Sequence, residues 1–207
     1  MSTIKFVILG DQKVGKTCLI NQYINQKFTY NQLPTITAGD KYTKELNLCN
    51  KELSLEIWDT VGQERFRSLN KIYLNNAKIA AIVYDITNQE TFDNLKKWYK
   101  DIKEKNNTIK IIGILANKSD LYEEKVVSKE EGENYANSIN GFFYETSAMD
   151  YESVSNAFEG LTKKYVENVL CEDNKIIKNI VNSKNENDSI KLKNNKKKIE
   201  EKKFLRC

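Results

Sequence analysis

Three nearly unbroken apolar runs constrain the fold of this chain more than any other feature, and they span residues 4–9, 79–84 and 109–115. Strands with one face in water alternate apolar and polar residues, whereas continuous apolar strands are buried on both faces, as in parallel sheets covered by helices. Longer amphipathic stretches alternate with the short apolar runs, at residues 17–24, 92–102, 128–139 and 152–168. This alternation predicts an α/β fold.

Two further segments extend the predicted sheet. Residues 41–48 alternate between polar and apolar except at Lys44, and after Cys49-Asn50-Lys51 a second run follows at 53–58, which is typical of a hairpin at a sheet edge. A short strand is expected at 142–145. The prediction is a mostly parallel six-stranded sheet with one antiparallel edge strand and helices on both faces.

Composition excludes several classes of function. The 207 residues contain no His, so Ser-His-Asp hydrolysis, Cys-His proteolysis and His-ligated zinc are impossible within the chain. The four cysteines, at positions 18, 49, 171 and 207, have neither metal-ligand nor redox spacing. No secretion signal, myristoylation signal or membrane-spanning run is evident.

Charge divides the chain into a body and a tail. Residues 172–207 hold 11 Lys and Arg against 6 Asp and Glu, whereas residues 1–171 hold 22 against 23. The tail is also rich in Asn and contains neither Gly nor Pro. We therefore expect one ordered domain over residues 1–170 and a flexible basic tail over 171–207. The near-neutral body gives no reason to expect a nucleic-acid partner.

A phosphate-binding motif follows the first apolar run. Residues 10–17 read GDQKVGKT, which fits G-x-x-x-x-G-K-[ST] between a strand and an amphipathic helix. Lys16 is expected to bridge the β- and γ-phosphates, and the Thr17 hydroxyl to ligate Mg²⁺. Taken alone, the pattern also fits a glycine turn before a surface lysine. The residues expected to surround the phosphates are Gly10, Asp11, Gln12, Lys13, Val14, Gly15, Lys16, Thr17 and Cys18.

A second motif, Asp59-Thr60-Val61-Gly62-Gln63, closes the apolar run at 53–58. Open α/β sheets bind ligands at the carboxyl ends of their strands, so Asp59 is placed to hold Mg²⁺ through water. Gly62 is expected to offer its N–H to the γ-phosphate, and Gln63 to orient the attacking water.

Two further motifs predict a guanine site. Asp120 of Asn117-Lys118-Ser119-Asp120 carries a carboxylate that matches the N1–H and 2-amino donors of guanine, whereas adenine has no 2-amino group. A site built around such a carboxylate rejects a base that leaves it unpaired. Lys118 is expected to lie along the base. The tetrapeptide Glu145-Thr146-Ser147-Ala148 is expected to give a backbone N–H to the guanine oxygen, and the predicted contacts with the base are Ser147, Ala148 and Met149. Each tetrapeptide alone also fits an ordinary polar loop.

The chain resembles the Ras superfamily of small GTPases over residues 4–168, and the Rab branch best. The resemblance rests on IWDTVGQERFRSL at 57–69 and on the stretch IYLNNAKIAAIVYDITNQETFDNLKKW at 72–98. It implies a switch that binds GTP or GDP with Mg²⁺, hydrolyses GTP slowly and regulates vesicle traffic. The implied partners are an exchange factor, a GTPase-activating protein and effectors.

Further roles follow only from the resemblance. Thr35 is the switch I threonine that reaches Mg²⁺ and the γ-phosphate, and Phe28 flanks the guanine. Ile36, Trp58 and Tyr73 belong to the effector surface. Lys16 and Gln63 are the catalytic residues.

Several positions depart from the Rab pattern. Thr37 stands where Rabs have Gly, and Asp40 replaces the Phe of the usual aromatic triad. Val61 replaces Ala, while Gln12 and Lys13 occupy phosphate-loop positions that are commonly small. These changes raise the hypothesis that hydrolysis is impaired, which leaves an alternative function: a guanine-nucleotide-binding adaptor that recruits effectors to a membrane.

The C-terminal segment KLKNNKKKIEEKKFLR precedes a final Cys207. Rabs usually end in paired prenylated cysteines, and FLRC is not a CaaX sequence. Prenylation of Cys207 together with the basic arm would attach the protein reversibly to the cytosolic face of an endomembrane. The alternatives are compositional bias with an unmodified Cys207, or a tail that binds RNA. A P-loop nucleotide kinase is disfavoured because the only Arg residues of the domain are Arg65 and Arg67.

Overall fold

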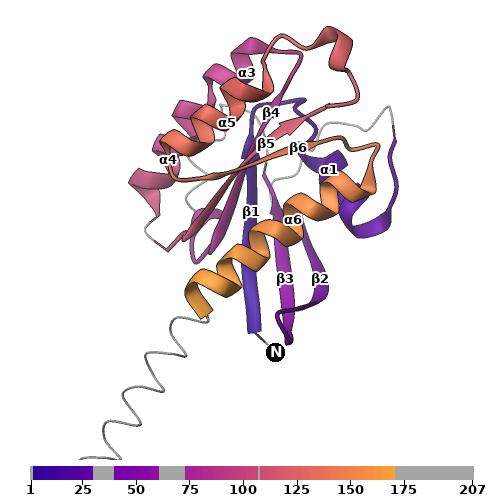
Figure 1. Cartoon of the computed structure of the whole chain (residues 1–207). Coiled ribbons are helices and arrows are strands. Elements are labelled where there is room, and N and C mark those ends of the chain that lie inside the picture. Colours follow the sequence, from indigo (N-terminus) through magenta and orange to yellow (C-terminus); the bar gives the residue numbers. More distant parts are fainter. Residues whose placement is uncertain (1, 30–39, 61–72, 107, 171–207) are drawn as a thin grey trace, which may run out of the picture. The chain divides into compact units, whose positions relative to one another are not determined.

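The computed structural model describes residues 2–29, 40–60, 73–106 and 108–170. A six-stranded sheet with the order β2-β3-β1-β4-β5-β6 forms its centre (Figure 1). The strands are β1 (Ser2–Gly10), β2 (Lys41–Leu48), β3 (Lys51–Asp59), β4 (Ile79–Asp85), β5 (Ile111–Asn117) and β6 (Phe142–Thr146). Neighbouring strands are parallel except for the β2–β3 pair at the edge, which confirms the predicted sheet.

Helices connect the strands. The α-helices are α1 (Lys16–Asn25), α3 (Gln89–Asp93), α4 (Leu95–Lys105), α5 (Lys129–Ser138) and α6 (Tyr151–Tyr165). Short turns of 3₁₀ and π helix occur at η2 (Tyr122–Glu124) and η3 (Val166–Leu170). A capping box starts α5, since Ser128 and Glu131 bond to each other's backbone N–H groups.

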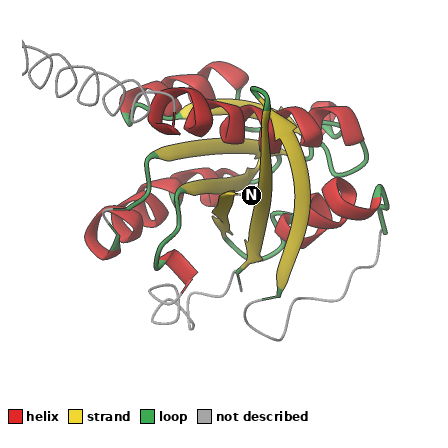
Figure 2. Cartoon of the chain, turned by 90° about the horizontal axis from the view of Figure 1, so that it is seen from below, coloured by secondary structure: helices red, strands yellow, loops and turns green. Residues whose placement is uncertain are grey.

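The central strands of the sheet are buried on both faces, which explains why they are nearly continuous apolar runs. On one face, Val7 and Leu9 of β1 belong to a core cluster with Leu95 and Trp98 of α4. On the other, Phe6 stacks on Phe158 of α6, with ring centroids 5.0 Å apart, and Tyr23 of α1 stacks on the same Phe158 ring at 4.6 Å. Figures 1 and 2 show the two groups of helices on opposite sides of the sheet.

The carboxyl ends of the five parallel strands meet at one edge of the sheet. The register pairs Gly10 with Val83 of β4, and Ile8 with Asp59. In the other half of the sheet, the register pairs Asp85 with Asn117, and Asn117 with Thr146. The motifs that follow these strands are therefore brought together, although they lie far apart in the sequence.

The structure divides the predicted helical stretch 92–102 into α3 and α4. Asn94 stands between them with φ −72° and ψ −11°, a tightened turn rather than regular α-helix. Sheet and helices form one compact unit, Met1–Val166. The predicted tail, 171–207, lies outside the described residues, so the proposed domain boundary stays a prediction. Within the described ranges, each helix is too short or too polar to cross a membrane.

Candidate nucleotide-binding site

Two glycines shape the predicted phosphate loop. Gly10 has φ 140° and Gly15 has φ 96°, conformations that side chains rarely adopt. A Cβ at Gly10 would collide with the carbonyl oxygen of Val83, and one at Gly15 with the side-chain amide of Asn117. The loop thus lies against β4 and β5, and any larger residue at either position would push it away from the sheet.

Lys16 is the most confined charge of the loop. The residue is only 6% exposed, and its Nζ donates to the carbonyl oxygens of Gly10 at 2.9 Å and Asp11 at 2.7 Å. Burial lowers the pKa of this ammonium to about 8, although the negative charges of Asp59 and Asp11 act in the opposite direction. An anion at the loop would favour the charged form, so the position is suited to binding phosphate.

Thr17 and Asp59 join the first turn of α1 to the end of β3. The Thr17 hydroxyl donates to Asp59 Oδ2 at 2.6 Å, and Asp59 is fully buried. Thr60 fixes the same strand end, because its hydroxyl donates to the carbonyl oxygen of Ile8 at 2.7 Å. Across the described ranges, no three Cys, Asp or Glu side chains lie close enough to hold a metal ion by themselves. Hard oxygen donors beside a phosphate loop nevertheless suit Mg²⁺, which commonly binds through one or two carboxylates plus substrate phosphates.

Asn117 bonds to the phosphate loop and to β6. Its side-chain Nδ2 donates to the carbonyl oxygen of Val14 at 2.7 Å, and its Oδ1 accepts from the buried Thr146 hydroxyl at 3.3 Å. Asn117 itself is 1% exposed. The first residue of the predicted base motif therefore holds three segments of the site together.

Lys118 follows in the left-handed conformation, with φ 66°. Its ammonium forms an ion pair with Asp85, the last residue of β4. Asp85 is in turn fixed by Thr87, whose N–H and hydroxyl both donate to Asp85 Oδ1, at 2.9 and 2.7 Å. The pair holds the Lys118 stem at the strand ends.

Asp120 lies in a more open environment. Its residue is exposed, and its Oδ1 accepts a hydrogen bond from the Ser147 hydroxyl. The same Ser147 oxygen accepts from the Met149 N–H at 3.1 Å, while the Ser147 N–H donates to Ser153 Oγ at 3.1 Å. Ser147 and Ala148 are buried, whereas Met149 is 48% exposed. The two predicted base loops thus meet at Asp120 and Ser147.

Comparison with known proteins agrees with this arrangement. Residues 5–167 match the model of the Ras family. Ras-related protein RabQ of Dictyostelium discoideum is 35% identical over 161 residues, which is 78% of this chain and 78% of that protein. Ras-related protein Rab-21 is 36% identical in Mus musculus and 37% identical in Bos taurus, over 171 residues, or 83% of this chain and 77% of each relative. The chain belongs to the Rab family of small GTPases.

Sequence reasoning missed several residues that support the site of this Rab-family GTPase. Asp85 closes an apolar strand just as Asp59 does, and that position was the signal that could have singled it out. Asn94 and Trp98 bond to the carboxylate of Asp11 from the α3–α4 segment, at 2.6 and 2.8 Å. No local sequence signal connects residues so far apart in the chain.

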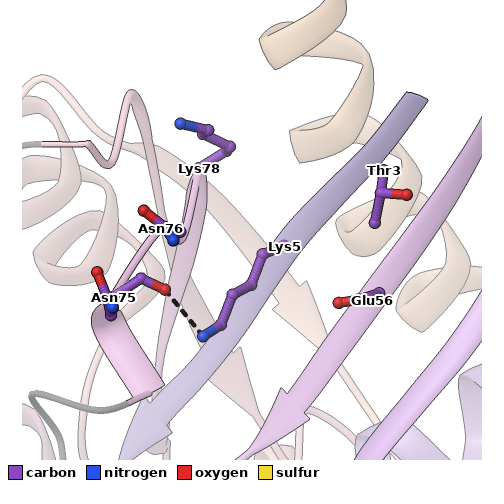
Figure 3. A pocket seen from close by; sticks show the side chains of 6 residues that line it. All are labelled: Thr3, Lys5, Glu56, Asn75, Asn76 and Lys78. Carbon is purple, nitrogen blue, oxygen red and sulfur yellow. Dashed lines mark hydrogen bonds between the residues drawn. The ribbon is translucent and has the colours of Figure 1, made fainter.

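Trp58 and Tyr73 lie together, with ring centroids 6.3 Å apart. Lys5 Nζ stands 4.3 Å from the Trp58 ring centroid and donates to the carbonyl oxygen of Asn75 at 2.9 Å. Beside them is an open hollow of about 530 Å³ (Figure 3). The hollow is lined by Thr3, Lys5, Glu56, Asn75, Asn76 and Lys78. A mixed polar surface therefore borders the aromatic pair.

Two further predicted residues lie in α1 or just after it. Phe28 follows α1 and is half-buried. Cys18 is half-buried in the first turn of α1, where burial and the charge of Asp59 raise the pKa of its thiol, so it stays protonated at neutral pH. The remaining predicted residues lie outside the described part of the chain: Thr35, Ile36, Gly62, Gln63 and Cys207.

Proposed function

We propose that this chain is a guanine-nucleotide switch of the Rab type, which binds GTP and GDP with Mg²⁺, hydrolyses GTP slowly and acts in membrane traffic. The observation that carries the proposal is the buried Lys16, held at the Gly10 and Asp11 carbonyls beside the Thr17–Asp59 pair. Family membership supports the same function.

The phosphate end performs binding and hydrolysis. The backbone from Gly10 to Cys18 surrounds the phosphates, and Lys16 neutralises the β- and γ-phosphate oxygens. Thr17, Asp59 and Thr35 would hold Mg²⁺, which neutralises charge on the phosphates when it is bound. Gly62 donates its N–H to the γ-phosphate, and Gln63 orients the attacking water.

The base end selects guanine. Asn117, Lys118 and Asp120 form one side of it, with Asp120 accepting from N1–H and the 2-amino group. Phe28 flanks the guanine ring. Ser147, Ala148 and Met149 supply the backbone donor to the guanine oxygen. Ala148 is the best candidate, because the N–H groups of Ser147 and Met149 already donate within the described residues.

Partners read the state of this switch. Ile36, Trp58 and Tyr73 form the effector surface, and an exchange factor and a GTPase-activating protein set the nucleotide state. Prenylated Cys207 with the basic tail attaches the protein reversibly to the cytosolic face of an endomembrane.

Equilibrium binding of fluorescent GDP and ADP to the Mg²⁺-loaded full-length chain tests the proposal. We expect GDP to bind at least about 100-fold more tightly than ADP, because adenine leaves Asp120 unpaired. Lys96→Ala, an exposed lysine on α4, serves as a control for general loss of charge. Equal affinity for the two nucleotides would reject a guanine-specific switch.

A second candidate is an adaptor whose hydrolysis is impaired. Gln12 and Lys13 are both exposed on the phosphate loop, and Lys13 has φ 66°, a conformation that glycine adopts at less cost. Single-turnover GTP hydrolysis by the wild-type chain and by Gln12→Gly/Lys13→Gly separates the candidates. A rate increase of about tenfold or more in the double variant would favour the adaptor. Equal rates would favour the switch.

A further inference from the structure

Asn94, the residue between α3 and α4, bonds to the phosphate loop. Asn94 ends α3 and precedes α4, a position at which an Asn side chain usually accepts from its own helix. Here the Asn94 side chain makes no such capping bond. Its Nδ2 instead donates to Asp11 Oδ2 at 2.6 Å, across 83 residues of sequence.

Trp98 completes the connection one helical turn later. Residues four apart lie on one face of a helix, so Trp98 and Asn94 point in the same direction. The Trp98 Nε1 donates to Asp11 Oδ1 at 2.8 Å, and the residue is 2% exposed within the core cluster of that sheet face. One oxygen of the Asp11 carboxylate is thus held by α4 and the other by the residue that precedes this helix.

The backbone of Asp11 bonds directly to Lys16. Its carbonyl oxygen accepts from Lys16 Nζ at 2.7 Å, the shorter of the two hydrogen bonds that hold the ammonium. Side chain and carbonyl belong to one residue, so anchoring the first restricts the orientation of the second. The connection runs from α4 through Asp11 to the lysine that meets the phosphates.

We propose that Asp11 is a positioning residue, through which Asn94 and Trp98 set the orientation of the phosphate loop and of Lys16 for the terminal phosphates of a guanine nucleotide. The proposal rests on the nucleotide-binding function above and adds a specific consequence. Loss of the anchor weakens binding of the β-phosphate more than binding of the nucleoside and α-phosphate.

The test compares GDP with GMP on the full-length chain with Mg²⁺. Asp11→Ala should weaken GDP binding by about tenfold or more while changing GMP affinity less than about threefold, because only GDP carries the phosphate that Lys16 meets. Equal losses for both nucleotides would indicate a merely structural role and overturn the proposal. GDP affinity equal to that of the wild type would overturn it as well.

Exchanging the Asp and Asn side chains between positions 11 and 94 provides the matched control. It also tests the proposal if Asp11→Ala fails to fold. Asn94→Asp sets two carboxylates against each other and should lower the ratio of GDP to GMP affinity. The double variant Asp11→Asn/Asn94→Asp again pairs an amide with a carboxylate and should restore that ratio. Failure to restore it would overturn the proposal. A wild-type chain that binds no GDP would instead reject the proposed function itself.

Discussion

The two ends of the site are built differently. At the phosphate end, Lys16 and Asp59 are nearly inaccessible, and Lys16 bonds to the loop backbone while Asp59 accepts from Thr17 of α1. The buried Asn117 of the base motif also donates to this loop, at Val14. At the base end, Asp120 is exposed and the described hydrogen bond of its carboxylate comes from Ser147. The phosphate end is rigidly preorganised, whereas the base end faces water.

This difference assigns different roles to the two ends. Preorganised donors lose little entropy on binding, so the phosphate end is suited to supply affinity. An exposed carboxylate discriminates strongly only when the bound base excludes water from it. Guanine selectivity therefore depends on the fit of the base itself, and we expect variants of the two ends to fail in different ways.

The largest effect is expected from Lys16→Ala. The substitution removes charge-assisted hydrogen bonds to the β- and γ-phosphates of GTP, each worth about 1.5–3 kcal/mol, so affinity for a non-hydrolysable GTP analogue should fall by about 10²–10⁴-fold. The preference for guanine over inosine nucleotides should remain, because the base end is unchanged. Calorimetric titration with non-hydrolysable analogues of GTP and ITP measures both quantities. A change in that base preference would contradict the separation of the two ends.

Asp120→Asn should alter selectivity rather than phosphate binding. An amide keeps one acceptor but replaces the other with a donor, which opposes the 2-amino group of guanine and matches the keto group of xanthine. We expect GDP affinity to fall by about 100-fold and affinity for xanthosine diphosphate to rise, as the loss of a bidentate charged pair implies. Competition binding with both diphosphates checks this. Unchanged GDP affinity would show that Asp120 does not contact the base.

A smaller effect is expected from pH, which should change protein stability and nucleotide affinity through Lys16 at the phosphate end. The Lys16 pKa of about 8 lies below the value near 10.4 of an unfolded lysine, so this group makes the nucleotide-free protein more stable as pH rises from about 8 to 10.4. Phosphate favours the ammonium, so binding should take up part of a proton above pH 8 and little at pH 7.

Calorimetry in buffers of different ionisation enthalpy measures that uptake. Above pH 8, GDP affinity should fall by up to about tenfold per pH unit. In the Lys16→Ala variant the uptake should disappear, which separates this lysine from other groups. Equal uptake in both proteins would contradict the assignment.

The sequence predicted the sheet and the strand-end motifs because both depend on local pattern. Continuous apolar runs identify strands buried on two faces, and parallel strands bring Gly10, Asp59, Asn117 and Thr146 to one edge. The antiparallel hairpin followed from the alternation at residues 41–48, and the structure shows the matching alternation of burial along β2. Family membership followed from long specific strings.

What sequence reasoning missed is how the motifs are held. The bonds from Asn94 and Trp98 to Asp11, and from Lys118 to Asp85, join segments whose proximity comes only from packing. The amphipathic stretch 92–102 likewise gave no sign of its break, because the Asn94 side chain bonds to the distant Asp11 and does not cap α4. Such contacts depend on tertiary structure, which local pattern does not encode.

The smallest expected effect tests whether Asn117 couples the two ends. In Thr146→Val a methyl group replaces the buried hydroxyl that donates to Asn117 Oδ1, which should lower the free energy of unfolding by about 1 kcal/mol. Asn117 also bonds to the phosphate loop, so affinities for GMP and GDP should fall together, by about two- to fivefold. Thr162→Val is the matched control, because that buried hydroxyl donates to Phe158 within α6. Thr162→Val should lower the free energy of unfolding by a similar amount and leave nucleotide affinity unchanged. A Thr146 variant that behaves like the Thr162 variant would mean that the two ends bind their parts of the nucleotide independently.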